Sequence, residues 1–285
     1  MENIKVKNLS IPKTAVIGKN VQIECETFQI GEHARIGDNV KINCKSFIAD
    51  DWLYICNDVE VGRGGCYGPK SNVYIGKHVG IFERTIINPS DEVYIGDNVG
   101  IGGEVMIWTH GAWLDVTEGF PSDFGPVKIG NNVWLPARSI VLPNVEIGDN
   151  TVIGIGSIIN RNIPSGCFAA GSPCKVIHED CYPNKLNNED LNKLIDKIIL
   201  DYKEIIKDKN IEPSLDIRYD KNTNILTLNE IYFGAAMISH HYNIKEKTYE
   251  GSPSDVSEDL RDYLRRRGIK IFTNNSFKSI KPKYL

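Results

Sequence analysis

The sequence predicts a mainly β fold, a parallel β-helix followed by a small α/β region, and two observations support this prediction. An aliphatic side chain returns at every sixth position from residue 129 onward: Ile129, Leu135, Val141, Ile147, Ile153 and Ile159. After Ile177 this rhythm stops, and helical and alternating patterns replace it. The change of pattern divides the chain into residues 1–177 and 178–285.

A period of six fits neither an α-helix, which needs apolar spacings of three and four, nor an alternating strand, which needs two. It fits a coil of three short strands that forms one turn of a triangular prism, with the aliphatic side chain stacked inside. Small or β-branched residues four positions later are also expected inside: Val133, Ser139, Val145, Thr151, Ser157 and Ile163. The same register occurs earlier, at Ile30, Ile36, Ile42 and Ile48, at Ile75, Ile81 and Ile87, and at Ile95, Ile101 and Ile107.

Tight corners must join these short strands. Turns such as Gly96-Asp97-Asn98 and Gly148-Asp149-Asn150 tolerate the positive φ that such corners require.

Composition excludes several classes of protein. The net charge is −4 over 285 residues, so no basic surface indicates a nucleic-acid partner. The N-terminus MENIKVKNLSI has no apolar signal core, and no segment approaches the ~18 apolar residues of a membrane span, so we expect a cytoplasmic protein. Seven scattered cysteines without a C-x-x-C spacing argue against a disulfide framework and a zinc site, and we expect no metal.

The hexad rhythm is interrupted at residues 50–55, 63–73, 88–94 and 109–126. A regular prism offers flat faces, so a site is expected where the chain leaves this regularity. The first two interruptions are short, and corner bulges explain them as well as substrate contacts do. The last carries a histidine and aromatic residues.

Residues 129–177, IGNNVWLPARSIVLPNVEIGDNTVIGIGSIINRNIPSGCFAAGSPCKVI, resemble the C-terminal signature of the hexapeptide-repeat acyltransferases. This resemblance implies a left-handed β-helix over about residues 17–177, with an extended loop at about 109–126. It further implies a homotrimer with active sites between subunits, and acetyl-CoA or another acyl-CoA as co-substrate.

The loop WTHGAWLDVTEGFPSDFGPV is similar to that of sugar and polysaccharide O-acetyltransferases, and this similarity implies His110 as catalytic base. The chemistry agrees, because a histidine titrates near neutral pH and can take the proton of an attacking hydroxyl. Glu104 occupies the equivalent position one hexad earlier, where it could orient the imidazole or be a solvated corner residue. Its catalytic role is therefore an open alternative.

Four residues near His110 are candidate acceptor ligands. Asp115 could contact sugar hydroxyls, and Trp108 and Trp113 offer flat faces to a sugar, although packing of the loop onto the prism explains either tryptophan alone better. Asp97 is a nearby carboxylate.

The resemblance also implies a CoA groove along the last coils. Small residues let backbone amides approach pantetheine, and two cations could meet phosphates, although ordinary surface charge explains them as well. The candidate CoA ligands are Trp134, Ala137, Gly154, Gly156, Ser157, Arg161, Gly171 and Lys175.

The region after residue 177 predicts a small α/β domain. A helix is expected from an N-cap at Asn187 or Asn188, two strands within residues 215–233 around a turn at 220–224, a helix over 254–267 that ends at Gly268, and a strand at 269–273. Simple sugar O-acetyltransferases end soon after the last coil, so this domain departs from their pattern.

We therefore expect an acyl-CoA-dependent transfer of an acetyl or short acyl group to a sugar hydroxyl, in glycan or surface-polysaccharide biosynthesis, with a direct ternary-complex mechanism. A similar appended lobe occurs in some N-acyltransferases of nucleotide-linked amino sugars, in which Glu104 and Asp97 would bind the acceptor and the CoA sulfur would take the proton. A non-catalytic scaffold is a third alternative. A γ-type carbonic anhydrase needs two histidines five residues apart, and no pair here has that spacing.

Overall fold

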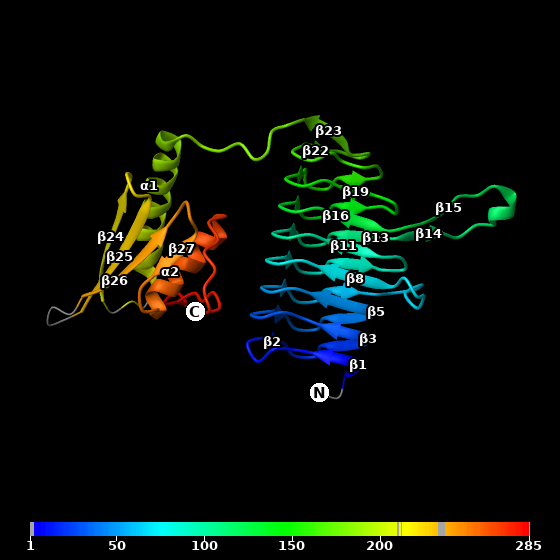
Figure 1. Cartoon of the computed structure of the whole chain (residues 1–285), viewed down its shortest axis with the longest axis horizontal. Coiled ribbons are helices and arrows are strands. Elements are labelled where there is room, and N and C mark those ends of the chain that lie inside the picture. The colour runs from blue at the N-terminus through cyan, green and yellow to red at the C-terminus, as the bar shows by residue number, and fades with distance from the viewer. Residues whose placement is uncertain (1–2, 210, 212, 233–236, 285) are drawn as a thin grey trace. The chain divides into compact units, whose positions relative to one another are not determined.

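The computed structural model describes residues 3–209, 211, 213–232 and 237–284. These form two compact units, Met1–Asn184 and Lys185–Leu285. The predicted boundary between residues 177 and 178 lies within the last strand of the first unit. The first unit is the predicted left-handed parallel β-helix, and the second combines helices with a sheet, so the predicted fold class is confirmed (Figure 1).

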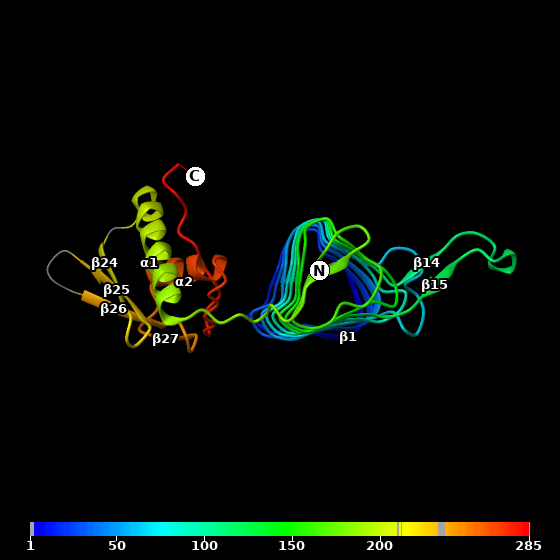
Figure 2. The same ribbon diagram turned by 90° about the horizontal axis from the view of Figure 1, so that it is seen from above.

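Parallel stacks of strands form the three faces of the prism, which has a triangular outline in Figure 2. The first face contains β7 (Glu60–Val61), β10 (Ile86–Asn88), β13 (Met106–Trp108), β18 (Ile140–Val141) and β21 (Ile158–Ile159). The second contains β8 (Asn72–Ile75), β11 (Val93–Ile95), β16 (Val127–Ile129) and β19 (Glu146–Ile147). The third contains β2 (Val16–Ile17), β4 (Arg35–Ile36), β6 (Tyr54–Ile55), β9 (Gly80–Ile81), β12 (Gly100–Ile101), β17 (Trp134–Leu135), β20 (Val152–Ile153) and β22 (Phe168–Ala170). A last strand, β23 (Lys175–His178), ends this face and pairs antiparallel with β22.

Three long strands begin the prism and pass from the first face to the second: β1 (Ile4–Ser10), β3 (Gln22–Gln29) and β5 (Lys41–Ala49). The start of β5 pairs with β7, and its end pairs with β8. We call the corner between these two faces the insertion corner, because later coils carry extra residues there.

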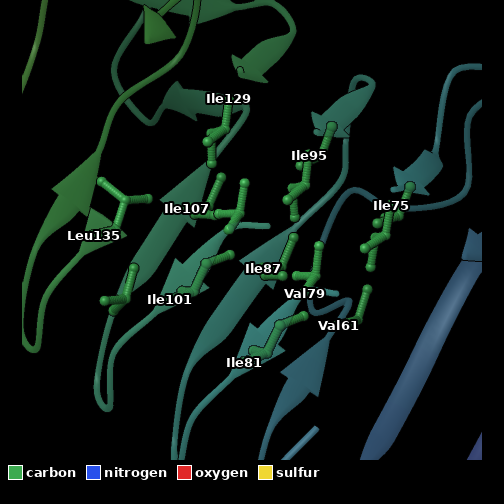
Figure 3. Close-up of a cluster of buried hydrophobic side chains, with 14 of the residues drawn as sticks. Val61, Ile75, Val79, Ile81, Ile87, Ile95, Ile101, Ile107, Ile129 and Leu135 are labelled. Carbon is green, nitrogen blue, oxygen red and sulfur yellow. The ribbon is translucent and has the colours of Figure 1, made fainter. Parts of the chain in front are cut away.

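The aliphatic side chains of the hexads fill the prism, as the close-up in Figure 3 shows for ten labelled residues from Val61 to Leu135. The small residues predicted inside are buried as well, including Ser139, Thr151 and Ser157. One register prediction was wrong. Ile48 is only half-buried, and Phe47 and Ala49 point inward instead, because β5 gains one residue as it turns the insertion corner.

Side-chain ladders hold the other corners. The carboxylate of Asp38 accepts a hydrogen bond from the backbone N–H of Lys19, 19 positions earlier. The side-chain oxygen of Asn131 likewise accepts from the backbone N–H of Asp97. The next residue takes positive φ, with values of 56° at both Asn98 and Asn150, as the turns predict. Segment 50–55, which the sequence analysis counted as an interruption, is an ordinary corner of this kind with Trp52 at φ 61°.

The second unit contains α1 (Asn188–Ile205), η2 (Ile206–Asp208), β24 (Ser214–Asp220), β25 (Ile225–Ile231), β26 (Met237–Asn243), β27 (Thr248–Glu250) and α2 (Asp255–Arg266). Both helices and the β24–β25 pair agree with the sequence analysis, with N-caps at Asn187 and Ser254. Phe233, the last residue of the predicted second strand, lies outside the described residues. Strands β26 and β27 were not predicted.

The predicted strand at 269–273 was wrong. This segment is irregular, and the guanidinium of Arg261 in α2 donates to the carbonyl oxygens of Ile271, Asn275 and Ser276. A side chain of the helix, rather than a neighbouring strand, therefore satisfies these carbonyls, while Ile269 and Ile271 are buried in the hydrophobic core of this unit.

Candidate active site

Three interruptions of the hexad pattern meet at the insertion corner. They are the loop of residues 62–71 after β7, the short bulge of residues 89–92 after β10, and residues 109–126 after β13. The last forms a hairpin of β14 (His110–Ala112) and β15 (Ser122–Phe124), joined through η1 (Val116–Glu118), and it projects away from the prism (Figure 2). Consecutive coils thus place their extra residues side by side.

His110 is the first residue of β14 and lies half-buried at the base of the hairpin. Its ring stacks on that of Phe124, its cross-strand partner, with 5.6 Å between centroids. Trp108 meets the imidazole edge-on at 6.2 Å. Two aromatic side chains therefore fix the plane of the imidazole.

Hydrogen bonds determine which ring nitrogen of His110 carries the proton. Its Nδ1 lies 2.8 Å from Oδ1 of buried Asn88 and 2.9 Å from Oγ of Ser90. The Asn88 Nδ2 donates to the carbonyl oxygens of Gly62 and Gly64 at 2.9 and 3.1 Å, so the Asn88 Oδ1 must face the imidazole as an acceptor. Nδ1 then carries the proton, and Nε2 of the neutral ring keeps its lone pair.

The 62–71 loop passes beside this nitrogen. A Cβ added to Gly65 would lie 3.7 Å from His110 Nε2 and 2.5 Å from Ser90 Oγ. Gly65 has φ +87°, a conformation in which a larger residue is strained. Glycine therefore keeps space open between the loop and the basic nitrogen.

Thr109 ties the hairpin to the bulge. Its hydroxyl donates to the Asn88 carbonyl oxygen at 2.8 Å and accepts from the Asp91 N–H at 2.9 Å. Asn88, Ser90 and Thr109 were not predicted as site residues. The interruption at 88–94 and the Thr-His-Gly sequence were the signals that could have indicated them.

Glu104 lies in a ladder of charged corner residues. Its carboxylate accepts from Arg138 at 2.7 Å and from Arg84 at 2.5 Å, and these guanidiniums, Arg138 first, hold the pKa of Glu104 below its usual value. Among the described residues, no hydrogen bond or ion pair joins Glu104 to His110. The structure thus places Glu104 as an anion between two arginines.

The candidate acceptor ligands are dispersed, and only Trp108 contacts His110. The Asp97 carboxylate accepts from the N–H of Lys77 at 2.7 Å, as part of a corner ladder. Asp115 caps η1 by accepting from the N–H of Thr117 at 2.9 Å, and hydrogen bonds to Thr117 lower the Asp115 pKa. Trp113 at the hairpin tip is 95% exposed.

The candidate CoA ligands gather in the last coils. Trp134 on β17 is exposed and packs beside Gly100 of the preceding coil. Ala137 and Gly156 meet at one corner, where the Gly156 N–H donates to the Ala137 carbonyl oxygen at 3.1 Å. Arg161 and Lys175 are exposed.

Several of these small residues also pack the prism. The buried Ser157 hydroxyl donates to the Gly154 carbonyl oxygen at 2.6 Å and accepts from the Gly171 N–H at 3.0 Å. A Cβ on Gly154 would lie 2.6 Å from that of Ala170, which requires glycine there. Close coil stacking is thus a sufficient reason for Ser157 and Gly154.

Within the described residues, no group of three or more His, Cys, Asp or Glu side chains is arranged to hold a metal ion. The helices in the part of the chain that the structure covers are too short or too polar to cross a membrane. Of the seven cysteines, six are buried and Cys181 is partly exposed.

Comparison with known proteins agrees with the repeat. The family described as bacterial transferase hexapeptide (six repeats) matches residues 126–161, and this match confirms the resemblance. Galactoside O-acetyltransferase from Escherichia coli (strain K12) is 54% identical over 54 residues, which are 19% of this chain and 27% of that protein. The chain thus spans well under two thirds of that relative.

Two solved structures are also similar. A maltose O-acetyltransferase from Clostridium difficile 630 is 25% identical, with 61% of this chain and 70% of that chain covered and a TM-score of 0.34. A galactoside acetyltransferase in complex with coenzyme A is 27% identical, with 56% and 70% covered and a TM-score of 0.32.

Proposed function

We propose that this hexapeptide-repeat chain is an acyltransferase that moves an acetyl or short acyl group from acyl-CoA to a sugar hydroxyl, with His110 as general base. The observation that supports it most is the hydrogen bond of His110 Nδ1 to Asn88, which leaves Nε2 as the basic nitrogen at the meeting point of three insertions. The acetyltransferase names of the relatives support the reaction type.

In this mechanism Nε2 removes the hydroxyl proton as the sugar oxygen attacks the thioester carbonyl carbon. The C–S bond breaks when the tetrahedral adduct collapses, and the CoA thiolate receives the proton from the imidazolium. Asn88 Oδ1 and Ser90 keep Nδ1 oriented and stabilise the charge that develops on the ring. Backbone N–H groups would stabilise the oxyanion.

For the co-substrate, we retain Trp134, Ala137, Gly154, Gly156, Ser157, Arg161, Gly171 and Lys175 as the CoA groove. The exposed Trp134 ring and the corner at Ala137 and Gly156 suit a thin pantetheine arm. Arg161 and Lys175 would meet the phosphates.

We further propose a homotrimer, because the hairpin exposes apolar side chains that its own prism does not cover. These are Trp113, Leu114, Val116, Phe120 and Phe124, with exposed fractions from 43% to 95%. A second copy of the chain would bury them and cover the hairpin base at His110. Polysaccharide biosynthesis and a cytoplasmic location belong to the same proposal.

The second unit favours one alternative acceptor, a nucleotide-linked amino sugar, because a folded domain of this size follows the last coil. In that case Glu104 and Asp97 would bind the amine. To bind the substrate, Glu104 would have to give up its ion pairs with Arg84 and Arg138. Asp97 would have to give up its hydrogen bond from the backbone N–H of Lys77.

Thiol release from acetyl-CoA, measured with a panel of sugars and nucleotide-linked amino sugars, tests the proposal. His110→Ala should lower kcat/KM by ~10²-fold or more, whereas the matched control His241→Ala, in the second unit, should retain activity. Near-wild-type turnover of an amino sugar by His110→Ala would contradict the base role and support the alternative. No turnover with any acceptor would support a scaffold.

A further inference from the structure

A groove of about 300 Å³ crosses the outer surface of β1, β3, β5 and β7 on the N-terminal side of His110. Its polar lining includes Gln22, Glu24, Lys41, Asn43, Arg63 and Tyr67. We infer that this groove binds a segment of an acidic glycan chain, whose next sugar lies at His110. This inference rests on the proposed function and names the class of acceptor.

Strand register builds the groove from two columns of outward side chains. Gln22 and Lys41 are cross-strand partners, and Glu60 is the next partner of Lys41. In the second column Lys5 pairs with Glu24, and Glu24 with Asn43. Because parallel strands in register place paired residues directly above one another, the two columns of side chains form walls parallel to the prism axis.

The second column leads to the active site. The next position in this column is Gly62, because a Cβ on Gly62 would lie 2.9 Å from the Asn43 carbonyl oxygen. The position after that is Asn88, whose side chain donates to the Gly62 carbonyl oxygen. Two strand spacings of ~4.8 Å separate Lys5 from Asn43, so the exposed part of this column is ~10 Å long, which exceeds a single pyranose ring. Gly62 and Asn88, beyond it, are buried.

The 62–71 loop joins groove and site directly. Arg63 and Tyr67 line the groove, while Gly65 between them lies against His110 Nε2. Two residues of backbone, at most ~7 Å, separate Tyr67 from Gly65, so a ligand in contact with Tyr67 lies next to the part of the loop that flanks Nε2. An acceptor longer than one sugar can use both places at once.

The chemistry of the lining suits a hydroxyl-rich anion. Two of its cations are paired, Lys5 with Glu24 at 3.9 Å and Arg63 with Glu60 at 3.0 Å. Lys41 has no ion pair in the part of the chain described, so the groove carries net positive charge. The amides of Gln22 and Asn43 can serve hydroxyls, and the Tyr67 ring, 83% exposed, can stack on a sugar face.

Calorimetric titration without CoA tests the groove, using oligogalacturonides from monomer to hexamer, and maltooligosaccharides of equal length as neutral probes. Wild type should bind the acidic ladder more tightly as length increases. Lys41→Gln and Tyr67→Ala should each weaken hexamer binding about three- to tenfold and leave monomer binding unchanged. The controls Lys13→Gln and Tyr284→Ala, both exposed and outside the groove lining, should match wild type.

Binding independent of length, or equal in variants and controls, would overturn the inference. Equal binding of the neutral ladder would overturn the acidic class. Because CoA is absent, these binding results are separate from turnover. Length-dependent binding without acyl transfer in the turnover assay would count against the proposed function and support the groove. Acyl transfer to single sugars without hexamer binding would support the proposed function and count against the groove.

Discussion

Replacing Asn88 by alanine removes the side chain that joins the 62–71 loop to His110. Five hydrogen bonds are lost. Nδ2 donates to the Gly62 and Gly64 carbonyl oxygens and to Cys66 Sγ, and Oδ1 accepts from His110 Nδ1 and Ser90 Oγ at 2.8 and 3.2 Å. At ~0.5–1.5 kcal/mol net for each of the five, we expect the free energy of unfolding to fall by ~2.5–7.5 kcal/mol. Tryptophan fluorescence during urea unfolding reports this, since all four tryptophans belong to the first unit and three of them lie in the prism coils.

The same substitution frees the imidazole to change tautomer and orientation, so kcat/KM should fall ~10²-fold. Asn72→Ala is the matched control. Buried Asn72 holds the same loop through the Pro69 carbonyl oxygen at 3.3 Å but does not contact His110, so this variant should lose stability and keep most of its activity. A folded Asn88→Ala protein within about threefold of wild-type kcat/KM, or an equal loss in Asn72→Ala, would refute the positioning role.

Three further predictions follow from single contacts. Glu104→Gln removes the partner of Arg84 and Arg138 and should leave kcat/KM for sugar hydroxyls within about twofold; a tenfold loss in steady-state assays would assign Glu104 a direct role. Trp113→Ser should leave the far-ultraviolet circular dichroism of the chain unchanged and shift sedimentation equilibrium toward smaller species. A trimer as stable as that of the wild type would show that the hairpin tip does not contribute to the interface. Burial lowers the pKa of His240 although Glu230 opposes this, so the unfolded chain takes up the proton first as pH falls below ~6.5. The second unit should therefore lose stability from pH 7 to 5.5, and His240→Gln should reduce that loss in hydrogen exchange; equal slopes would contradict it.

Periodicity predicted the prism because every coil repeats one requirement, an aliphatic side chain inside, as at Ile129 and Leu135. It failed at Ile48, where one inserted residue reversed the alternation and placed Phe47 inside. A six-residue template cannot locate an insertion within a continuous strand, since Phe47, Ile48 and Ala49 are all apolar and any of them could point inward.

The site was only partly predictable. The loss of rhythm at residue 109 indicated His110, yet Asn88 and Ser90 are brought to it by coil stacking, 22 and 20 positions earlier in the chain. Whether two interruptions share a corner depends on the accumulated length of the coils between them. The irregular segment 269–273 has a similar cause, because its backbone partner is the side chain of Arg261, which no local pattern reveals.

The variable lengths of the coils also bear on how the chain folds. Equivalent corner contacts are separated by 18 residues between Asn131 and Asp149 but by 34 between Asp97 and Asn131, where the hairpin intervenes. Loop-closure entropy grows with the logarithm of length, so nearly doubling this separation costs only ~0.6 kcal/mol. A solenoid can therefore lengthen one coil by a whole hairpin with little effect on the probability that the next coil docks. Contacts between adjacent coils also keep contact order low for so β-rich a chain.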